Sequence, residues 1–418
     1  MKKIRYFLRF CRVILVACAA PVEKPIIKLP EFLELLDEKT LPAFSDDLNM
    51  ESLEIAITRS LRYYDRLPEG RIIRVGPARY TAGEMKETLK VFLSILKSPD
   101  PWAQKERRIT ESFDIYRATG SGIKGTVLFT GYYEPVLKAS MVETVEYRYP
   151  IYRAPKDLLF INLEKFKERY KGERLVARVE KGEIVPYHSR EEIDGEGALK
   201  GRGLEIAWFS DPVDIFFLHI QGSGKICPAG GNCFQVSYAL ANGRPYRSIG
   251  RFLMDRGKIL PGEMSTPAIK QHLRENPDEL NEILHYNESY VFFRTVKEGP
   301  VGSLDVSVTA GRSIATDQTI FPRGALAFIR TRKPVVDASG QVSAWTSFSR
   351  FVLNQDTGGA IVGPGRVDLF CGSGSEAGAV AGYMKEEGEL YFLVLKKKGS
   401  RSRNYRVPGS GYRGSGTG

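Results

Sequence analysis

From residue 125 onward, the chain is built of short runs of β-branched and aromatic residues separated by glycine and proline. Typical runs are 126–130, 214–220, 304–308 and 366–370. Runs of this length, bounded by turn-forming residues, are typical of β-strands. They do not alternate with regularly repeated helical segments, as a parallel sheet of βαβ units would require. The pattern therefore predicts a mainly β fold, either an antiparallel sheet or a barrel.

Three segments have helical periodicity instead. Residues 51–67, which follow two aspartates, and residues 82–96 carry apolar side chains at helical spacing. Residues 265–284 show the same spacing, interrupted by Pro277. The sequence therefore predicts helices at the N-terminal side of the β region and one broken helix within it.

The positive charge of the chain lies at its two ends. The formal net charge is +11, but residues 1–17 hold five basic groups and residues 396–418 hold seven, with no acidic residue in either segment. The remainder has 49 basic and 50 acidic residues. A neutral body argues against a nucleic-acid-binding face, which needs clustered positive charge. We expect the glycine-, serine- and arginine-rich tail, residues 399–418, to be disordered.

The first residues have the features of an export signal. A basic start is followed by a short apolar run, and the four residues that end at Cys18 resemble the bacterial lipobox, in which the cysteine is lipidated. A plain signal peptide cut near Ala20 is the alternative. We expect a lipoprotein signal peptide over 1–17, lipidation of Cys18 and a linker over 18–32. This places the protein in the periplasm, lipid-anchored, with the outer membrane as its expected site.

Two cysteines, Cys227 and Cys233, bracket a short loop. In an oxidising compartment they can form a disulfide, although chance proximity in sequence is equally compatible with two free thiols. A zinc site is less favoured because the chain has only four histidines and no second cysteine pair. No metal site is therefore predicted.

Three aspartates stand beside strand-like runs or glycine turns: Asp317, Asp356 and Asp368. Taken singly, each is explained by a turn or by an outward strand position. Taken together, their order and surroundings resemble the 3D domain of the membrane-bound lytic murein transglycosylase A family. Four further segments are similar to motifs of that family: Phe129-Thr-Gly-Tyr-Tyr-Glu-Pro135, and residues 208–224, 242–250 and 287–294. The resemblance covers roughly residues 125–395.

The resemblance implies a double-psi β-barrel formed by residues 33–133 and 295–398, which include the 3D segment. It implies a second β-barrel inserted between these parts, over residues 134–294, with the glycan in the groove. The implied enzyme is a peptidoglycan lytic exotransglycosylase, a lyase that needs no cofactor. It would cut the β-1,4 bond between N-acetylmuramic acid and N-acetylglucosamine and leave a 1,6-anhydromuramyl end.

The resemblance also suggests roles for individual residues. Asp368 is expected to act as acid and then as base, with Asp356 in support, and Asp317 is expected to be structural. The pKa of Asp368 must then be raised, by partial burial or by a nearby like charge. Hydroxyl, amide, aromatic and guanidinium groups suit contacts with a sugar. The expected substrate-binding residues are Thr130, Gly131, Tyr132, Tyr133, Gln221, Gly222, Ser223 and Arg247.

Other functions fit parts of the sequence. Asp356-Thr357-Gly358 is also the triplet of aspartic proteases, but that mechanism needs two such carboxylates and the chain has no second triplet. A non-catalytic wall-binding barrel protein and a hydrolytic muramidase are the remaining alternatives. The expected partners are peptidoglycan glycan strands, the membrane through the lipid anchor, and possible cell-wall synthesis or division proteins. No nucleic acid is expected.

Overall fold

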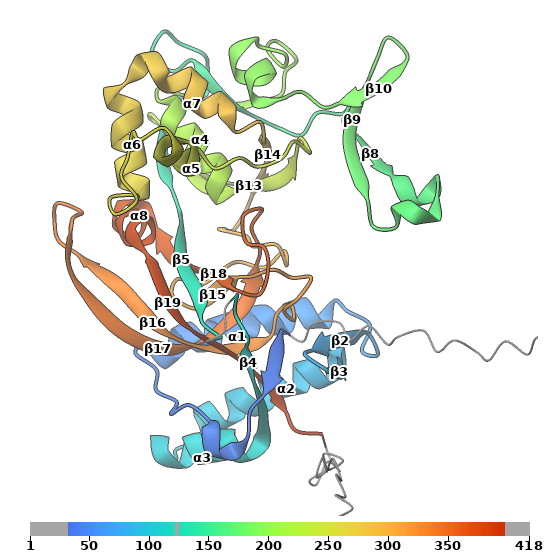
Figure 1. Ribbon diagram of the computed structural model, residues 1–418, viewed down its shortest axis with the longest axis vertical. Helices are drawn as coiled ribbons and strands as arrows, with labels where there is room; N and C mark the ends of the chain where they lie inside the picture. Colours follow the sequence, from blue (N-terminus) through green and yellow to red (C-terminus); the bar gives the residue numbers. More distant parts are fainter. Residues whose placement is uncertain (1–31, 122–124, 398–418) are drawn as a thin grey trace, which may run out of the picture. The chain divides into compact units, whose positions relative to one another are not determined.

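The computed structural model describes residues 32–121 and 125–397 (Figure 1). The predicted signal peptide, Cys18, the linker up to residue 31 and the tail 399–418 lie outside these described residues.

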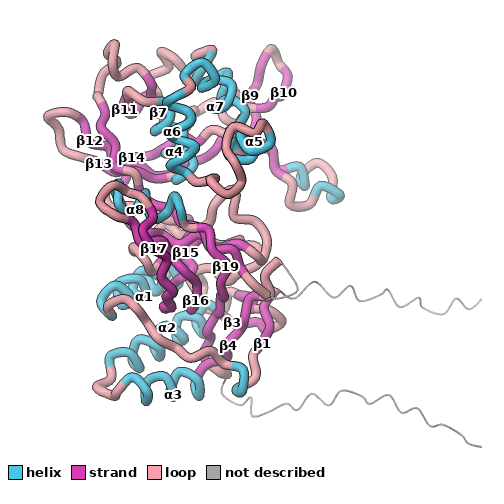
Figure 2. The backbone as a smooth tube through the Cα atoms, turned by 60° about the vertical axis from the view of Figure 1, so that its left-hand side comes forward, coloured by secondary structure: helices cyan, strands magenta, loops and turns pink. Residues whose placement is uncertain are grey.

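The N-terminal part is helical, as predicted. Asn49 caps the first helix through the Ser52 amide, and Thr81 and Glu84 form a capping box on the second. The buried faces of both helices share one apolar core with the barrel strands, beside which they lie in Figure 2. The elements of this part are β1 (Leu33–Leu35), η1 (Glu38–Thr40), α1 (Met50–Asp65), β2 (Ile72–Val75), β3 (Ala78–Thr81), α2 (Ala82–Lys97), α3 (Trp102–Ser112) and β4 (Phe113–Ala118).

Six strands close into a barrel. Their order is β19, β16, β17, β15, β18 and β5, and β5 pairs back with β19. Two pairs are parallel, β5 with β18 and β15 with β17, whereas the other pairs are antiparallel. The mainly β prediction is confirmed, and the double-psi crossing stays a prediction. The strands are β5 (Val127–Glu134), β15 (Ser313–Ala315), β16 (Leu326–Val336), β17 (Val342–Asp356), β18 (Arg366–Ser373) and β19 (Lys385–Leu395), with α8 (Gly374–Tyr383) between the last two.

The chain between β5 and β14 forms smaller sheets, with apolar cores of its own. The sheets contain four, two and three strands, in the orders β14-β13-β12-β6, β11-β7 and β10-β9-β8. Single bridges from Ser140 to Trp208 and from Arg153 to Phe293 join the edges of the first two, but these pairings do not establish the predicted second barrel. The strands are β6 (Val136–Ala139), β7 (Tyr149–Tyr152), β8 (Leu159–Asn162), β9 (Arg174–Glu180), β10 (Glu183–Pro186), β11 (Glu205–Phe209), β12 (Ser223–Pro228), β13 (Phe234–Ala241) and β14 (Val291–Val296).

Helices cover these sheets, and one of them corrects the sequence analysis. The strand predicted at 214–220 is wrong, because this segment lies within α4 (Pro212–Gln221). Asp211 caps the helix and Gly222 ends it with a φ of 74°. Most residues of α4 are buried and apolar on all sides of the helix. The sequence therefore lacks the alternation of apolar and polar residues that reveals a helical period. The other helices are α5 (Ile249–Asp255), α6 (Thr266–Glu275) and α7 (Leu280–Tyr286), and short helical turns are η2 (Leu163–Lys165), η3 (Glu168–Tyr170), η4 (Glu191–Gly195) and η5 (Pro277–Glu279).

The strand predicted at 304–308 is also wrong. Residues 303–306 form a turn followed by a bend, in which Asp305 has a φ of 55°, a conformation outside the β region of regular strands. The broken helix predicted at 265–284 is confirmed, because α6 ends before Pro277 and α7 follows. None of the helices in the described ranges is long and apolar enough to cross a membrane.

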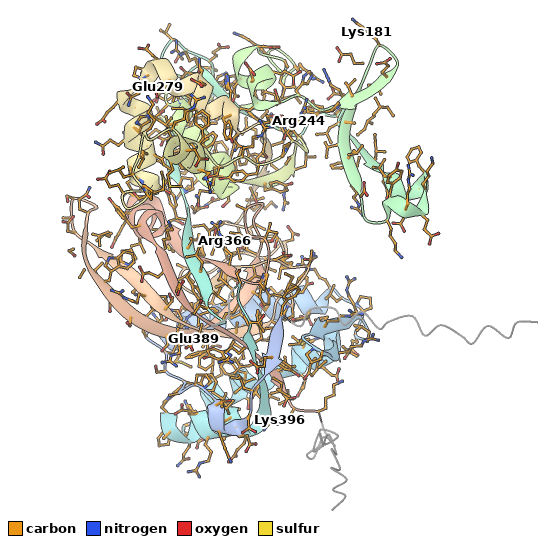
Figure 3. The ribbon with its side chains drawn as sticks, in the orientation of Figure 1. Lys181, Arg244, Glu279, Arg366, Glu389 and Lys396 are labelled. Atoms are coloured by element: carbon orange, nitrogen blue, oxygen red, sulfur yellow. A yellow bond between two sulfur atoms is a disulfide. The ribbon has the colours of Figure 1, made fainter. Side chains whose placement is uncertain are left out.

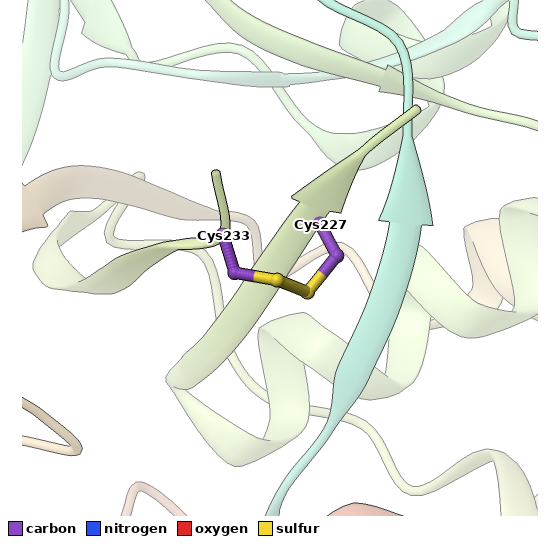
Figure 4. Close-up of a disulfide and its surroundings, with 2 residues drawn as sticks. All are labelled: Cys227 and Cys233. Atoms are coloured by element: carbon purple, nitrogen blue, oxygen red, sulfur yellow. A yellow bond between two sulfur atoms is a disulfide. The ribbon is translucent and has the colours of Figure 1, made fainter. Parts of the chain in front are cut away.

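A disulfide joins Cys227 to Cys233 (Figure 4). It links the end of β12 to the residue just before β13, with the two Cα atoms 4.1 Å apart. The bond therefore closes the loop of a β-hairpin that belongs to the four-stranded sheet.

Candidate active site

The barrel places two of the three aspartates at the same height along neighbouring strands. Ala315 on the short strand β15 pairs with Asp356 on β17 at one side and with Asp368 on β18 at the other. Side chains at paired positions of neighbouring strands point to the same face of a sheet. The two carboxylates therefore belong to one face, although twelve positions separate them in the chain.

Asp368 lies in a partly enclosed position. Its side chain is 17% exposed, and the Thr130 hydroxyl of β5 donates a hydrogen bond to its Oδ1 atom. The Nε atom of Arg366 lies 3.8 Å from the same oxygen; Figure 3 labels Arg366 at the start of β18. Burial raises the pKa of Asp368 to about 6, against the opposing charge of Arg366 and with a further rise from Asp356. This carboxyl can carry a proton near neutral pH.

Asp356 is held by several donors. Its Oδ1 accepts hydrogen bonds from the amides of Ser303 and Thr357, at 2.8 and 2.9 Å, and its Oδ2 accepts one from the Tyr132 hydroxyl at 3.0 Å. Burial raises the pKa of Asp356, although these hydrogen bonds act in the opposite direction. The side chain is therefore fixed in place and acts on Asp368 through its charge.

The hydrogen bonds of Asp317 connect two loops. Its Oδ1 accepts from the amide and hydroxyl of Thr319, and its Oδ2 accepts from the Gly363 amide at 2.8 Å. Burial by itself would raise the pKa of Asp317, but the hydrogen bonds from Thr319 and Gly363 outweigh it and the pKa is lowered. This carboxyl is kept ionised and joins two loops.

A cavity of about 600 Å³ lies beside the aspartates. Its lining includes Gln221, Gly222 and Ser223, which were predicted as a group, together with Asp356. Tyr246 lines it as well. Partial burial raises the pKa of Tyr246, and the charges of Arg366 and Asp368 both act on its hydroxyl. Asp368 is therefore close to the cavity, because its charge acts on Tyr246 and it is itself affected by Asp356, and both of these residues line the cavity.

The predicted motif on β5 divides between two faces of the strand. Thr130 and Tyr132 contact the two aspartates, whereas Gly131 and Tyr133 face helix α8. A Cβ atom at Gly131 would lie 2.7 Å from the Cα of Ala381, so the strand and helix can approach only because this residue is glycine. Gly131 and the Tyr133 ring therefore make packing contacts with α8, and their predicted contacts with a sugar stay predictions. The Tyr133 amide donates to Gln221 at 2.9 Å and anchors that side chain.

Arg247 is not part of this cluster. Its guanidinium forms an ion pair with Glu288 at 2.9 Å and lies over the Tyr286 ring. Its guanidinium is therefore engaged in an ion pair in this structure, and its predicted role in substrate binding stays a prediction.

Two residues of the cavity were missed in the sequence analysis. Arg190 is fully buried and lines the cavity with His219. Its Nη1 atom lies 3.0 Å from Nδ1 of His219, and its Nη2 donates to the Ser289 carbonyl at 2.7 Å. Burial, and then the Arg190 charge, lower the pKa of His219 and keep its ring neutral. No sequence motif marks Arg190: one partner, Asp194, is four residues away, but His219 and Ser289 are 29 and 99 residues away.

Comparisons with known proteins agree on one family. Models of the MltA specific insert domain and of the 3D domain match residues 128–294 and 312–394. The membrane-bound lytic murein transglycosylase A of Escherichia coli K12 is 33% identical over 283 residues, which are 67% of this chain and 69% of that protein.

Two solved structures are similar over most of the chain. The membrane-bound lytic murein transglycosylase from Agrobacterium tumefaciens matches with a TM-score of 0.73 and 32% identity, over 87% of this chain and 97% of that one. E. coli MltA with bound chitohexaose matches with a TM-score of 0.67 and 26% identity, over 87% and 95%. The chain therefore belongs to the membrane-bound lytic murein transglycosylase A family.

Proposed function

We propose that this protein is a lytic transglycosylase that cleaves the glycan strands of peptidoglycan, with Asp368 as both acid and base. The observation that carries the proposal is the position of this carboxyl beside the cavity, with a hydrogen bond from Thr130 and a pKa raised to about 6. The activity in the names of the relatives supports the choice of substrate and reaction.

The acid step uses the protonated form of Asp368. The carboxyl donates its proton to the oxygen between N-acetylmuramic acid and N-acetylglucosamine, and the bond from that oxygen to C1 of the muramyl sugar breaks. Thr130 holds the carboxyl by donating to its other oxygen. Burial keeps the proton on Asp368 at a pH where an exposed aspartate would be ionised.

The base step uses the same carboxyl after it has lost its proton. Asp368 takes the proton of the C6 hydroxyl of the muramyl sugar, and that oxygen bonds to C1 to close the 1,6-anhydro ring. Glycosidases that add water ordinarily need a second carboxylate as nucleophile or base. Here the nucleophile belongs to the substrate, so one acid/base residue is enough. Asp356, with three hydrogen-bond donors on it, serves as a fixed charge.

The cavity offers groups that suit a sugar. Gln221 is anchored by the Tyr133 amide, Ser223 carries a hydroxyl, and Tyr246 adds an aromatic ring with a polar end. Such groups contact both the hydroxyls and the apolar faces of a sugar ring. In a relative, E. coli MltA, the bound molecule is chitohexaose.

We also propose the domain boundaries and the anchor. Residues 33–133 with 295–398 form the catalytic barrel domain, and residues 134–294 form the insert, a second barrel closed at the two bridges from Ser140 and Arg153. The protein is lipidated at Cys18 and held at a periplasmic membrane surface, for which we propose the outer membrane. The matched relatives are named membrane-bound.

The reaction is tested by digesting purified sacculi and weighing the released fragments by mass spectrometry. We expect fragments with 1,6-anhydromuramyl ends, each lighter by one water than the product of hydrolysis. Fragments with reducing ends alone would identify a muramidase. Binding to sacculi without any release would identify a wall-binding protein.

The pH dependence of cleavage tests the role of Asp368, because two substitutions are expected to shift it in opposite directions. Because only protonated Asp368 can donate, the rate is expected to fall about tenfold per pH unit above a pKa of about 6. Asp356→Asn removes a charge that raises this pKa, so the fall begins at lower pH. Arg366→Gln removes a charge that lowers it, so the fall begins at higher pH. The measurement is kcat/KM between pH 4 and 9, because kcat/KM reports pKa values of the free enzyme and this range extends at least about two units on each side of the pKa. Shifts in the same direction would contradict the assignment of Asp368 as the acid.

A further inference from the structure

A second cavity, of about 510 Å³, lies between helix α1 and the chain that follows β14. We call it the basic pocket. Its lining contains more basic than acidic side chains. The basic ones are Arg59, Arg62, Arg66, Arg294 and Lys297, and the acidic ones are Glu298 and Asp305.

Helix α1 and its C-cap residue, Arg66, place three arginines on one side of the pocket. Arg59, Arg62 and Arg66 are three and then four positions apart, a spacing that sets side chains on the same face of a helix. Arg59 is fixed, because its Nη1 donates to the Val308 carbonyl at 2.9 Å and to the Thr309 hydroxyl at 2.7 Å. The row is therefore held in position by the fold.

The positive charge in the pocket is not neutralised. Arg66 and Arg294 share one carboxylate, that of Asp305, at 3.4 and 2.9 Å. Within the described ranges, no ion pair joins Arg62 or Lys297 to an acidic residue. Burial, and then the charge of Arg62, lower the pKa of Arg59 against the opposing influence of Glu298. An anion that entered the pocket would meet guanidinium and ammonium donors without partners.

The basic pocket adjoins the cavity beside the aspartates. Arg294, Val301 and Asp305 line both. In peptidoglycan each muramyl sugar carries a short peptide with free carboxylates, and four extended residues reach about 14 Å. Because Arg294 lines both cavities, it is the basic side chain that such a peptide would meet between them.

We infer that the basic pocket binds the stem-peptide carboxylates of the glycan strand being cut, an inference that rests on the function proposed above. Arginine suits this role, because its planar guanidinium donates two parallel hydrogen bonds to a carboxylate. The pocket thereby selects peptide-bearing strands over bare ones, whereas the cavity beside the aspartates binds the sugars common to both.

The test compares three substrates: glycan strands with intact stem peptides, strands freed of peptides by an amidase, and strands whose stem carboxylates have been converted to amides. The variant is Arg62→Gln with Lys297→Gln, two exposed positions that leave the core intact. The matched control is Lys165→Gln with Lys167→Gln, which removes the same charge from exposed positions between β8 and β9. The measurement is kcat/KM on each substrate.

We expect the wild type and the control to prefer acidic peptide-bearing strands over both other substrates by about tenfold, the effect of one good charge-assisted contact. The pocket variant should lose this preference through a higher KM and still cut peptide-free strands like the wild type. Equal kcat/KM on acidic and amidated strands in the wild type would overturn the inference and leave the proposed function intact. Failure of the wild type to cut any of the three would instead refute the proposed function.

Discussion

Replacing Asp368 by asparagine is expected to slow glycan cleavage by about 10² to 10⁴-fold, the usual contribution of a general acid or base. The amide has almost the shape of the carboxyl, and its oxygen can still accept the hydrogen bond from Thr130. What it lacks is a proton that can be donated and taken back. The measurement is the release of soluble fragments from sacculi, and binding to sacculi should persist.

Asp317→Asn is the matched control for this experiment. It makes the same chemical change in the same part of the chain, but Asp317 only joins loops through Thr319 and Gly363. We expect its turnover to stay within about threefold of the wild type, because its loss removes a structural hydrogen bond and no proton donor. If Asp368→Asn kept a tenth of the wild-type rate or more, another residue would have to be the acid. If both variants lost turnover equally, the distinction between the two aspartates would fail.

Replacing Arg312 by methionine is expected to lower the free energy of unfolding by about 3–5 kcal/mol. The guanidinium is fully buried and contacts Asp46 at 2.6 Å, the Ser52 hydroxyl at 3.0 Å and the Asn49 carbonyl at 2.9 Å. These contacts join the start of α1 to the segment just before β15. Methionine fills similar space but leaves Asp46 buried without its counter-charge, and chemical denaturation measures the loss.

Arg117→Met provides the comparison for Arg312. Arg117 on β4 forms an ion pair with Glu34 at 2.9 Å, but both side chains are largely exposed, at 40% and 57%. Exposed ion pairs contribute at most about 1 kcal/mol because solvent screens them. We therefore expect a small change in the free energy of unfolding for this variant. Equal losses at the two positions would show that burial of the Arg312 pair does not matter to stability.

Local structure was predictable where the chain carries its own signals. Helices α1 and α2 combine apolar spacing with capping residues, and Pro277 breaks the third predicted helix where the structure breaks it. The same reasoning failed for α4, since a helix with most of its surface buried shows no apolar stripe. Helix α8, rich in glycine and alanine, was missed because its short side chains show little amphipathic contrast.

The candidate site was predictable as a set of residues but not as an arrangement. The motifs contained Thr130, Tyr132, Gln221, Asp356 and Asp368, which the fold brings to one region. The motifs did not show that Gly131 and Tyr133, which alternate with Thr130 and Tyr132 on β5, face the other side of the strand and pack against α8. The roles assigned to these residues in binding and catalysis stay predictions.

By itself, the sequence determined the mainly β character of the chain, its N-terminal helices and the family motifs, because propensity, capping and periodicity act over a few neighbouring residues. Only the tertiary structure decided which side chains meet. Thr130 contacts Asp368 across 238 positions, and Arg59 approaches Val308 across 249. Such contacts depend on barrel closure and strand register, and these depend on the packing of the whole core. The raised pKa of Asp368 and the basic pocket therefore appear only in the folded chain.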